Sequence, residues 1–310
     1  MRGLNMAESS KLWEKLTSDV FQKIDKSFLE NFRAPGQENK FVAWDPYEPS
    51  TRYLKFLLYT IASKQTNEFF EAYRKIKMSN YGNPLSVSYS DCNINADYLA
   101  AVEEWQFLKS CGGFEGVSSV VEIGAGFGRT CHAILTLSPQ IKEYSIVDLD
   151  PMLELSRQYL SQVAPEVLDR VSFISSNDVD LQEQLRPDLV INIDSFQEMP
   201  SSIIEGYMNR IVRKANKFYC KNPVGKYLPE AVGMPQLGPE KLLDVFKLGR
   251  CTNVIDIFCE QELQSARDDF VNKYLPPPYD NFNEIKPYKA RQTQVMDLFP
   301  YFHHVLYVRG

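Results

Sequence analysis

The chain has 310 residues, of which 44% are hydrophobic and 24% charged, with a formal net charge of −6. This composition is typical of a globular enzyme with enough chain for a full core, and the acidic balance, without a dense Lys/Arg cluster, argues against a nucleic-acid partner. No apolar run approaches the roughly 18 residues of a membrane span, and the N-terminus has no signal-peptide pattern. The cysteines are scattered without a Cys-x-x-Cys pair, which suggests neither a zinc site nor a redox motif. We therefore expect reduced thiols and a cytoplasmic protein.

Helical periodicity dominates residues 1–95, which we expect to form a helical N-terminal cap or lid. Apolar residues recur at three- or four-residue steps over 8–32, 51–63 and about 66–78. The segment 81–97 begins with the turn signal Tyr81-Gly82-Asn83-Pro84 and predicts a loop that either contacts a ligand or is a plain linker. The cap is either a purely structural cover or a lid that excludes water from a substrate.

Strands and helices alternate in the core, which we assign to residues 96–310. We expect strands at 119–123, 144–148, 171–174, 189–193 and 218–220, with helices before and between them. Asp150 is expected to cap the helix that begins with Pro151, and Ser202-x-x-Glu205 is expected to form a capping box. The alternation predicts an α/β fold with a doubly wound, mostly parallel seven-stranded sheet.

The pattern is weaker after Pro223, where we expect a lid-like insertion at about 224–295. It would contain a loop over 224–240, a helix over 240–248, a sixth strand over 252–258 and a helix over 260–274 that ends before Pro276. Residues 279–294 are expected to be extended or wrapped over the surface, and 302–308 to form the closing strand, antiparallel at the sheet edge.

The strand at 119–123 runs into three alternating glycines, in the pattern Glu122-x-Gly124-x-Gly126-x-Gly128. Glycines let the backbone turn sharply and let a ligand approach the main chain, although an ordinary βα turn without a ligand has the same pattern. Parallel sheets bind ligands at the carboxyl ends of their strands. The polar residues at those ends are Glu122, Asp148, Asn177, Asp178, Asp194 and Ser195.

The residues near the glycines indicate which class of ligand the turn could bind. The third glycine of a dinucleotide motif would fall on Arg129, and the lysine of a phosphate-binding loop is absent. The predominance of acids suits a cationic or amine-bearing ligand. Asp148, about 20 residues after the last glycine, is placed to accept both hydroxyls of a ribose, a role that an NAD site shares.

Residues 96–225 resemble class I S-adenosylmethionine-dependent methyltransferases. Val120 to Gly128 is similar to their first motif, Val147-Asp148 to their ribose-binding acid, and Asn177-Asp178 to their adenine-contacting pair. Gly126-Phe127-Gly128-Arg129, Val147-Asp148-Leu149 and Asn192-x-x-Ser195-Phe196-Gln197-Glu198-Met199 resemble the putative sugar O-methyltransferases of bacteria. That family often has Asp-Leu-Pro after the second strand, whereas here Asp150 precedes Pro151.

The resemblance implies S-adenosylmethionine as cofactor, S-adenosylhomocysteine as product, and a sugar or sugar-containing small molecule as acceptor. Gly124, Ala125 and Gly126 would lie against the cofactor, and Glu122 would hold the turn or the cofactor's amino group. The other implied cofactor contacts are Asp148, Leu149, Asn177, Asp178 and Ser195.

The implied catalytic residues are Glu198, as base or substrate-binding acid, and Asp194, as support. A helix-terminal acid stabilised by the dipole is the alternative for Glu198. Of the three histidines, we expect His132 to be structural, and we give His303 and His304 minor catalytic weight.

Several alternatives stay open. Asp194 and Asn222 could contribute to a Mg²⁺ site, although Lys221 stands where a second acid would help. The rival functions are a methyltransferase for another small metabolite or a protein side chain, an NAD-dependent oxidoreductase, and a non-catalytic nucleotide-binding protein. A homo-oligomer is compatible with the sequence.

Overall fold

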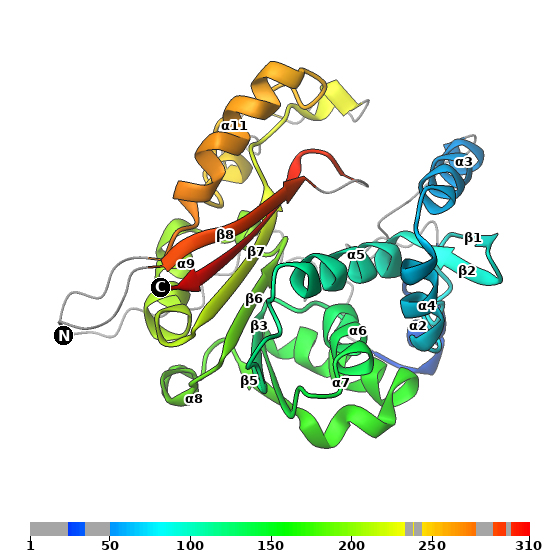
Figure 1. Ribbon diagram of the computed structural model, residues 1–310, viewed down its shortest axis with the longest axis horizontal. Helices are drawn as coiled ribbons and strands as arrows, with labels where there is room; N and C mark the ends of the chain where they lie inside the picture. Colours follow the sequence, from blue (N-terminus) through cyan, green and yellow to red (C-terminus); the bar gives the residue numbers. More distant parts are fainter. Residues whose placement is uncertain (1–23, 35–49, 233–237, 239–243, 277–287, 296–298) are drawn as a thin grey trace.

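A seven-stranded sheet forms the centre of the protein (Figure 1), with the strand order β5-β4-β3-β6-β7-β9-β8. The computed structural model describes residues 24–34, 50–232, 238, 244–276, 288–295 and 299–310. Strands β3 (Ser119–Ile123), β4 (Glu143–Asp148), β5 (Val171–Ser175), β6 (Leu189–Ile193) and β7 (Lys217–Pro223) are parallel. Strand β9 (Phe302–Arg309) is antiparallel to β7 and to β8 (Tyr288–Val295). The predicted doubly wound, mostly parallel sheet is therefore confirmed.

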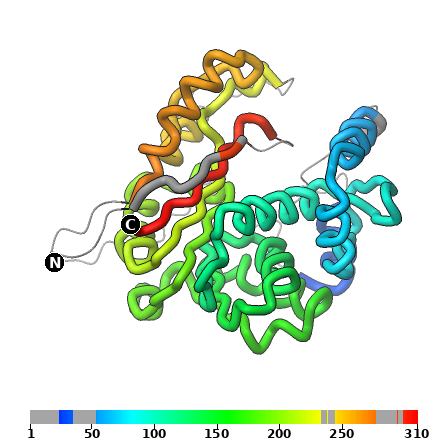
Figure 2. The backbone as a smooth tube through the Cα atoms, in the orientation of Figure 1, coloured from blue at the N-terminus to red at the C-terminus, as the bar shows by residue number. Residues whose placement is uncertain are grey.

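The last two strands differ from the prediction. Strand β9, drawn in red in Figure 2, runs inside the sheet rather than at its edge. The reason is that β8 pairs with its far side. The predicted strand at 252–258 is wrong: only Val254 makes an isolated bridge, to Lys226. Strand β8 has the polar sequence Tyr-Lys-Ala-Arg-Gln-Thr-Gln-Val, which an edge strand tolerates and which hides it from hydrophobic patterns.

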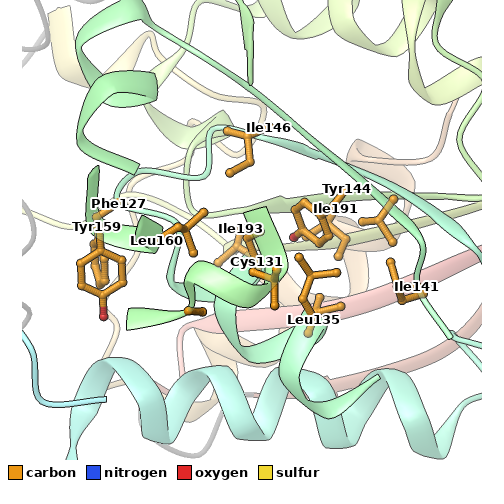
Figure 3. Close-up of a cluster of buried hydrophobic side chains, with 14 of the residues drawn as sticks. Phe127, Cys131, Leu135, Ile141, Tyr144, Ile146, Tyr159, Leu160, Ile191 and Ile193 are labelled. Carbon is orange, nitrogen blue, oxygen red and sulfur yellow. The ribbon is translucent and has the colours of Figure 1, made fainter. Parts of the chain in front are cut away.

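Helices cover both faces of the sheet. Successive strand residues point to opposite sides, and apolar strand residues on each side pack into a buried cluster. Val120, Tyr144, Ile146 and Ile191 pack on the side of α5 (Ala96–Ser110), α6 (Arg129–Leu137) and α7 (Asp150–Val163). Figure 3 shows part of this layer, with Cys131 and Leu135 of α6 next to the strand side chains. Residues of the opposite parity pack against α9 (Ser201–Arg210) and α11 (Glu260–Lys273).

Short helical segments complete the core: η1 (Pro165–Arg170), α8 (Val179–Gln184), η2 (Phe196–Glu198), η3 (Val212–Lys214) and η4 (Pro229–Val232). Both predicted helix caps are wrong. Leu149 precedes α7, so that Asp150 is its first helical residue, and α9 begins at Ser201 after Pro200, one residue before Ser202. Within the described residues, the structure contains no helix with the length and apolar character that a bilayer span needs.

The N-terminal part contains α2 (Lys26–Asn31), α3 (Ser50–Ser63), α4 (Asn67–Lys75) and a hairpin of β1 (Ser86–Tyr89) and β2 (Cys92–Asn95). The hairpin replaces the loop predicted over 81–97. Its turn residues Ser90 and Asp91 have φ of 50° and 58°, a conformation that is usually signalled by Asn-Gly or Asp-Gly. Parts of several predicted segments lie outside the described residues. These are 8–23 of the predicted helix 8–32, 35–49 of the N-terminal part, 239–243 of the loop and helix predicted over 224–248, and 279–287 of the segment 279–294.

Arg33 joins this N-terminal part to the core. Its buried guanidinium donates to Asp97 at 2.7 Å and to Asn95 at 2.8 Å, at the start of α5. The same group lies 5.1 Å from the ring centre of Phe127, in the glycine turn, and 5.4 Å from that of Tyr98. The N-terminal part is thus attached next to the glycine turn, on the α5 side of the sheet (Figure 1).

Candidate functional site

The glycine turn connects β3 to α6 and requires glycine at its first position. Gly124, Gly126 and Gly128 have φ of 74°, 59° and 89°, values that L side chains adopt at a cost. A Cβ on Gly124 would lie 2.2 Å from Ser195 Oγ and 2.4 Å from Ser195 Cβ. The turn therefore lies directly on the loop that follows β6.

Buried amides support this contact from below. Asn192 Nδ2 donates to the Ile123 carbonyl at 2.9 Å and to Ser195 Oγ at 2.6 Å, and Ser195 Oγ also lies 3.0 Å from that carbonyl. Asn222 Nδ2 donates to Asn192 Oδ1 at 2.8 Å. Ser195 thus holds the end of β3. Asn192 and Asn222 support it, a role that was not predicted from the sequence.

Asp148 lies at the end of β4, against the glycine turn. Its Oδ2 accepts from the Gly126 N–H at 3.0 Å, and its Oδ1 accepts from the Leu149 N–H at 2.8 Å. Burial, with a smaller contribution from the charge of Glu198, raises the pKa of Asp148 to about 7 against the lowering effect of these N–H groups. Each carboxylate oxygen keeps a further lone pair, so Asp148 can still accept two ligand hydroxyls.

Asn177 and Asp178 follow β5 at the same edge of the sheet. Asp178 caps α8, since its Oδ1 accepts from the Leu181 N–H at 3.0 Å. Asn177 is exposed, and its N–H donates to Ser175 Oγ at 3.2 Å. The carboxylate of Asp178 has a second oxygen with which it can accept from a ligand amino group.

Asp194 and Glu198 occupy the loop after β6. Asp194 is exposed and has φ of 62°, a strained conformation that is often found at functional positions. Its N–H donates to the Lys221 carbonyl at 2.8 Å, and its carboxylate accepts from Gln197. The charge of Glu198 contributes to the raised pKa of Asp148.

Glu122 lies beneath the turn in a buried network of charges. It accepts from the Tyr144 hydroxyl at 2.8 Å, and burial raises its pKa to about 7. Arg129 contributes a compensating charge to Glu122 and donates to Glu104 Oε1 at 3.1 Å; Lys221 donates to the same oxygen. Glu122 is therefore held by groups of β4 and α6, and its two expected roles stay predictions.

The histidines are buried. His132 Nδ1 lies 2.6 Å from the Tyr98 hydroxyl, and His304 Nδ1 lies 2.8 Å from the Tyr219 hydroxyl. Burial lowers the pKa of both His132 and His303 to about 4. These rings therefore remain neutral inside the protein. In the described part of the chain, no group of three or more His, Cys, Asp or Glu side chains is arranged to hold a metal ion.

The chain matches no family model and no curated protein. Among solved structures it is similar to the mitomycin 7-O-methyltransferase MmcR, with 14% identity, 69% of this chain covered and a TM-score of 0.39. The chain spans 57% of the length of that protein.

Two further structures have comparable similarity. The methyltransferase domain of bacterial CtHen1 has 14% identity and a TM-score of 0.42, with 69% of this chain and 100% of that chain covered. An O-methyltransferase family protein from Burkholderia thailandensis has 11% identity and a TM-score of 0.40, with 84% of this chain and 70% of that chain covered.

Proposed function

We propose that the protein is an S-adenosylmethionine-dependent O-methyltransferase that acts on a hydroxyl group of a small molecule, with a sugar as the favoured acceptor. The observation that carries the proposal is the position of Asp148, whose carboxylate lies on the glycine turn and accepts from the Gly126 and Leu149 N–H groups. A carboxylate in this place suits the ribose of an adenosine ligand.

The residues of this edge fit a cationic cofactor. The loops 124–128, 148–150, 175–179 and 194–199 contain Asp148, Asp150, Asp178, Asp194 and Glu198 but neither lysine nor arginine. When bound, S-adenosylmethionine supplies an electrophilic methyl group on a positively charged sulfur. Asp148 would hold the ribose, Asp178 with Asn177 the adenine, and Gly124, Ala125, Gly126 and Ser195 the remainder, with Leu149 beside them.

The chemistry also needs a group that takes the proton of the acceptor hydroxyl, because a neutral hydroxyl is a weak nucleophile. Asp194 and Glu198 are the candidates. The charge of Glu198 contributes to the raised pKa of Asp148, and the Asp194 N–H donates to the Lys221 carbonyl of β7. We assign the role of base or substrate-binding acid to Glu198, and support of the cofactor or of the site to Asp194.

Thermal unfolding with separate ligands tests the cofactor. S-adenosylhomocysteine at about 100 times its dissociation constant should stabilise the fold by roughly 2.7 kcal/mol, whereas NADH should have no effect. Stabilisation by NADH alone would refute the proposal in favour of an oxidoreductase. Transfer of a labelled methyl group to a panel of sugars, phenols and peptides then identifies the acceptor class, and transfer only to peptides would contradict the small-molecule assignment.

A further inference from the structure

Helix α3 has apolar side chains on two of its faces. Leu58 and Ala62 are buried, and they pack in the cluster that also contains residues of α4 and α5. On the rest of the helix surface, four large apolar side chains are between 47% and 63% exposed: Tyr53, Phe56, Leu57 and Tyr59. We call these four residues the α3 face. Figure 1 shows α3 at the outer end of the N-terminal part, away from the sheet.

Exposed apolar side chains are concentrated on this helix. Eleven large hydrophobic side chains of the described residues are exposed, and four of them fall within seven consecutive positions of α3. Tyr59 also packs edge to face on Tyr89 of β1, with ring centroids 5.2 Å apart. The outer face of a surface helix is normally polar, and a cluster of exposed apolar side chains marks an interaction site. The α3 face therefore indicates a partner.

The charge of this part of the chain is positive. From Ser50 to Gln65 the charged residues are Arg52, Lys55 and Lys64, without any aspartate or glutamate. Lys55 and Lys64 are exposed. Residues 50–95, which form α3, α4 and the hairpin, contain six lysine or arginine residues and three acids, Glu68, Glu71 and Asp91. Glu68 pairs with Lys109 at 2.7 Å. A basic segment thus surrounds the α3 face in a chain whose net charge is −6.

Apolar and basic side chains together indicate the chemistry of the partner. A second copy on this face would bring the same cations together, because a two-fold interface pairs a patch with itself, and like charges oppose such contact. An anionic bilayer instead attracts lysine and arginine to its surface. It also takes aromatic and aliphatic side chains at the boundary between headgroups and acyl chains. With 14 residues, α3 is too short to span a bilayer, and contact at the surface needs no spanning run.

We propose that the α3 face docks this protein on the surface of a membrane that contains anionic phospholipids. Phe56 and Leu57 enter the headgroup region, and Tyr59 lies at its border. Lys55 and Lys64 contact the negatively charged groups of the lipids. The docking goes beyond the proposed methyl transfer and does not depend on it.

Co-sedimentation of the full chain with vesicles tests the docking. One set of vesicles is phosphatidylcholine with about 30% phosphatidylserine, and the other is phosphatidylcholine alone. At about 0.1 M salt we expect binding to the anionic vesicles, and binding to the neutral vesicles that is weaker by at least about 10-fold. Binding to the anionic vesicles should weaken at about 1 M salt, because the charges are then screened.

Variants locate the contact on α3. Phe56→Gln combined with Leu57→Gln removes apolar contact and should weaken binding to the anionic vesicles by at least about 10-fold. Lys55→Gln removes one charge and should weaken it by about 5-fold. Phe258→Gln is the matched control, because Phe258 is 74% exposed but lies between Asp256 and Glu260, outside the N-terminal part. It should bind as the unmodified protein does. If the double variant does not fold, Lys55→Gln still tests the docking.

Other outcomes would overturn the inference. Absence of binding to the anionic vesicles, or equal binding by the folded α3 variants, would refute the docking, and equal binding to both kinds of vesicle would refute the role of the lysines. A dimer in sedimentation velocity that Phe56→Gln with Leu57→Gln dissociates, in place of vesicle binding, would assign the face to a second copy. A lower melting temperature of that variant with unchanged vesicle binding would show that the chain itself covers the face.

Discussion

Replacing Gly124 by alanine combines backbone strain with a steric clash. At φ of 74° an alanine costs about 1–2 kcal/mol. The new Cβ would also lie 2.2 Å from Ser195 Oγ and 2.4 Å from Ser195 Cβ. Rotation of the serine cannot remove the second contact, so Ser195 has to shift and lose its hydrogen bonds to Asn192 and Ile123, at about 1 kcal/mol each. We expect a total loss of about 3–4 kcal/mol in the free energy of unfolding.

Urea denaturation, followed by tryptophan fluorescence, measures this loss. Gly116→Ala is the matched control, because Gly116 has φ of 67° but a Cβ added there would meet no heavy atom within 4 Å, so that only strain of about 1–2 kcal/mol remains. Adding Ser195→Gly to Gly124→Ala removes the clashing atoms, so the double variant should be more stable than the sum of the single losses by about 1–2 kcal/mol. Equal losses at Gly124 and Gly116, or strict additivity with Ser195→Gly, would refute the reasoning.

Three further predictions concern charged groups. Asp148→Asn should weaken S-adenosylhomocysteine binding by about 2–4 kcal/mol in calorimetry. Because the pKa of Asp148 is about 7, its carboxyl loses its proton between about pH 5.5 and 8, and binding to the unmodified protein should strengthen over that range. An affinity that does not change with pH would contradict this. The pKa of Glu122 is raised to about 7 in the folded protein, so its contribution to stability is full below about pH 4 and is lost as the pH rises through 7. Glu122→Gln should flatten this part of the curve of unfolding free energy against pH. An unchanged slope in the variant would contradict the raised pKa. Arg33→Ala leaves Asp97 without its 2.7 Å ion pair and should lower the free energy of unfolding, measured by urea denaturation, by about 3–5 kcal/mol. Arg33→Lys should restore only part of this loss, because lysine lacks the planar, forked guanidinium. A loss below about 1 kcal/mol in Arg33→Ala would show that the N-terminal part does not depend on this contact.

Local patterns predicted those parts of the fold in which each element carries its own signal. The five parallel strands are short apolar runs, the helices α5, α6 and α7 lie before and between them as expected, and α11 falls within the helix predicted over 260–274. The hairpin at 86–95 was missed because its turn is Ser90-Asp91 instead of a glycine-containing pair. Strand β8 was missed because its residues are largely polar. In both cases pairing with a partner strand determines the structure, and pairing has no local signature.

The order of the amino acids was enough to identify the residues at the carboxyl ends of the strands, because strand ends and glycine turns are local features. Gly124, Asp148, Asp178 and Asp194 accordingly lie along one edge of the sheet. What each residue contacts depended on the folded chain. Glu122 faces a buried network with Arg129, Glu104 and Lys221. Tyr301 is held beside the end of β7, because its carbonyl accepts from the Val224 N–H and β9 pairs with β7. Such contacts join residues far apart in the chain, and the order of the strands, which no local pattern encodes, brings them together.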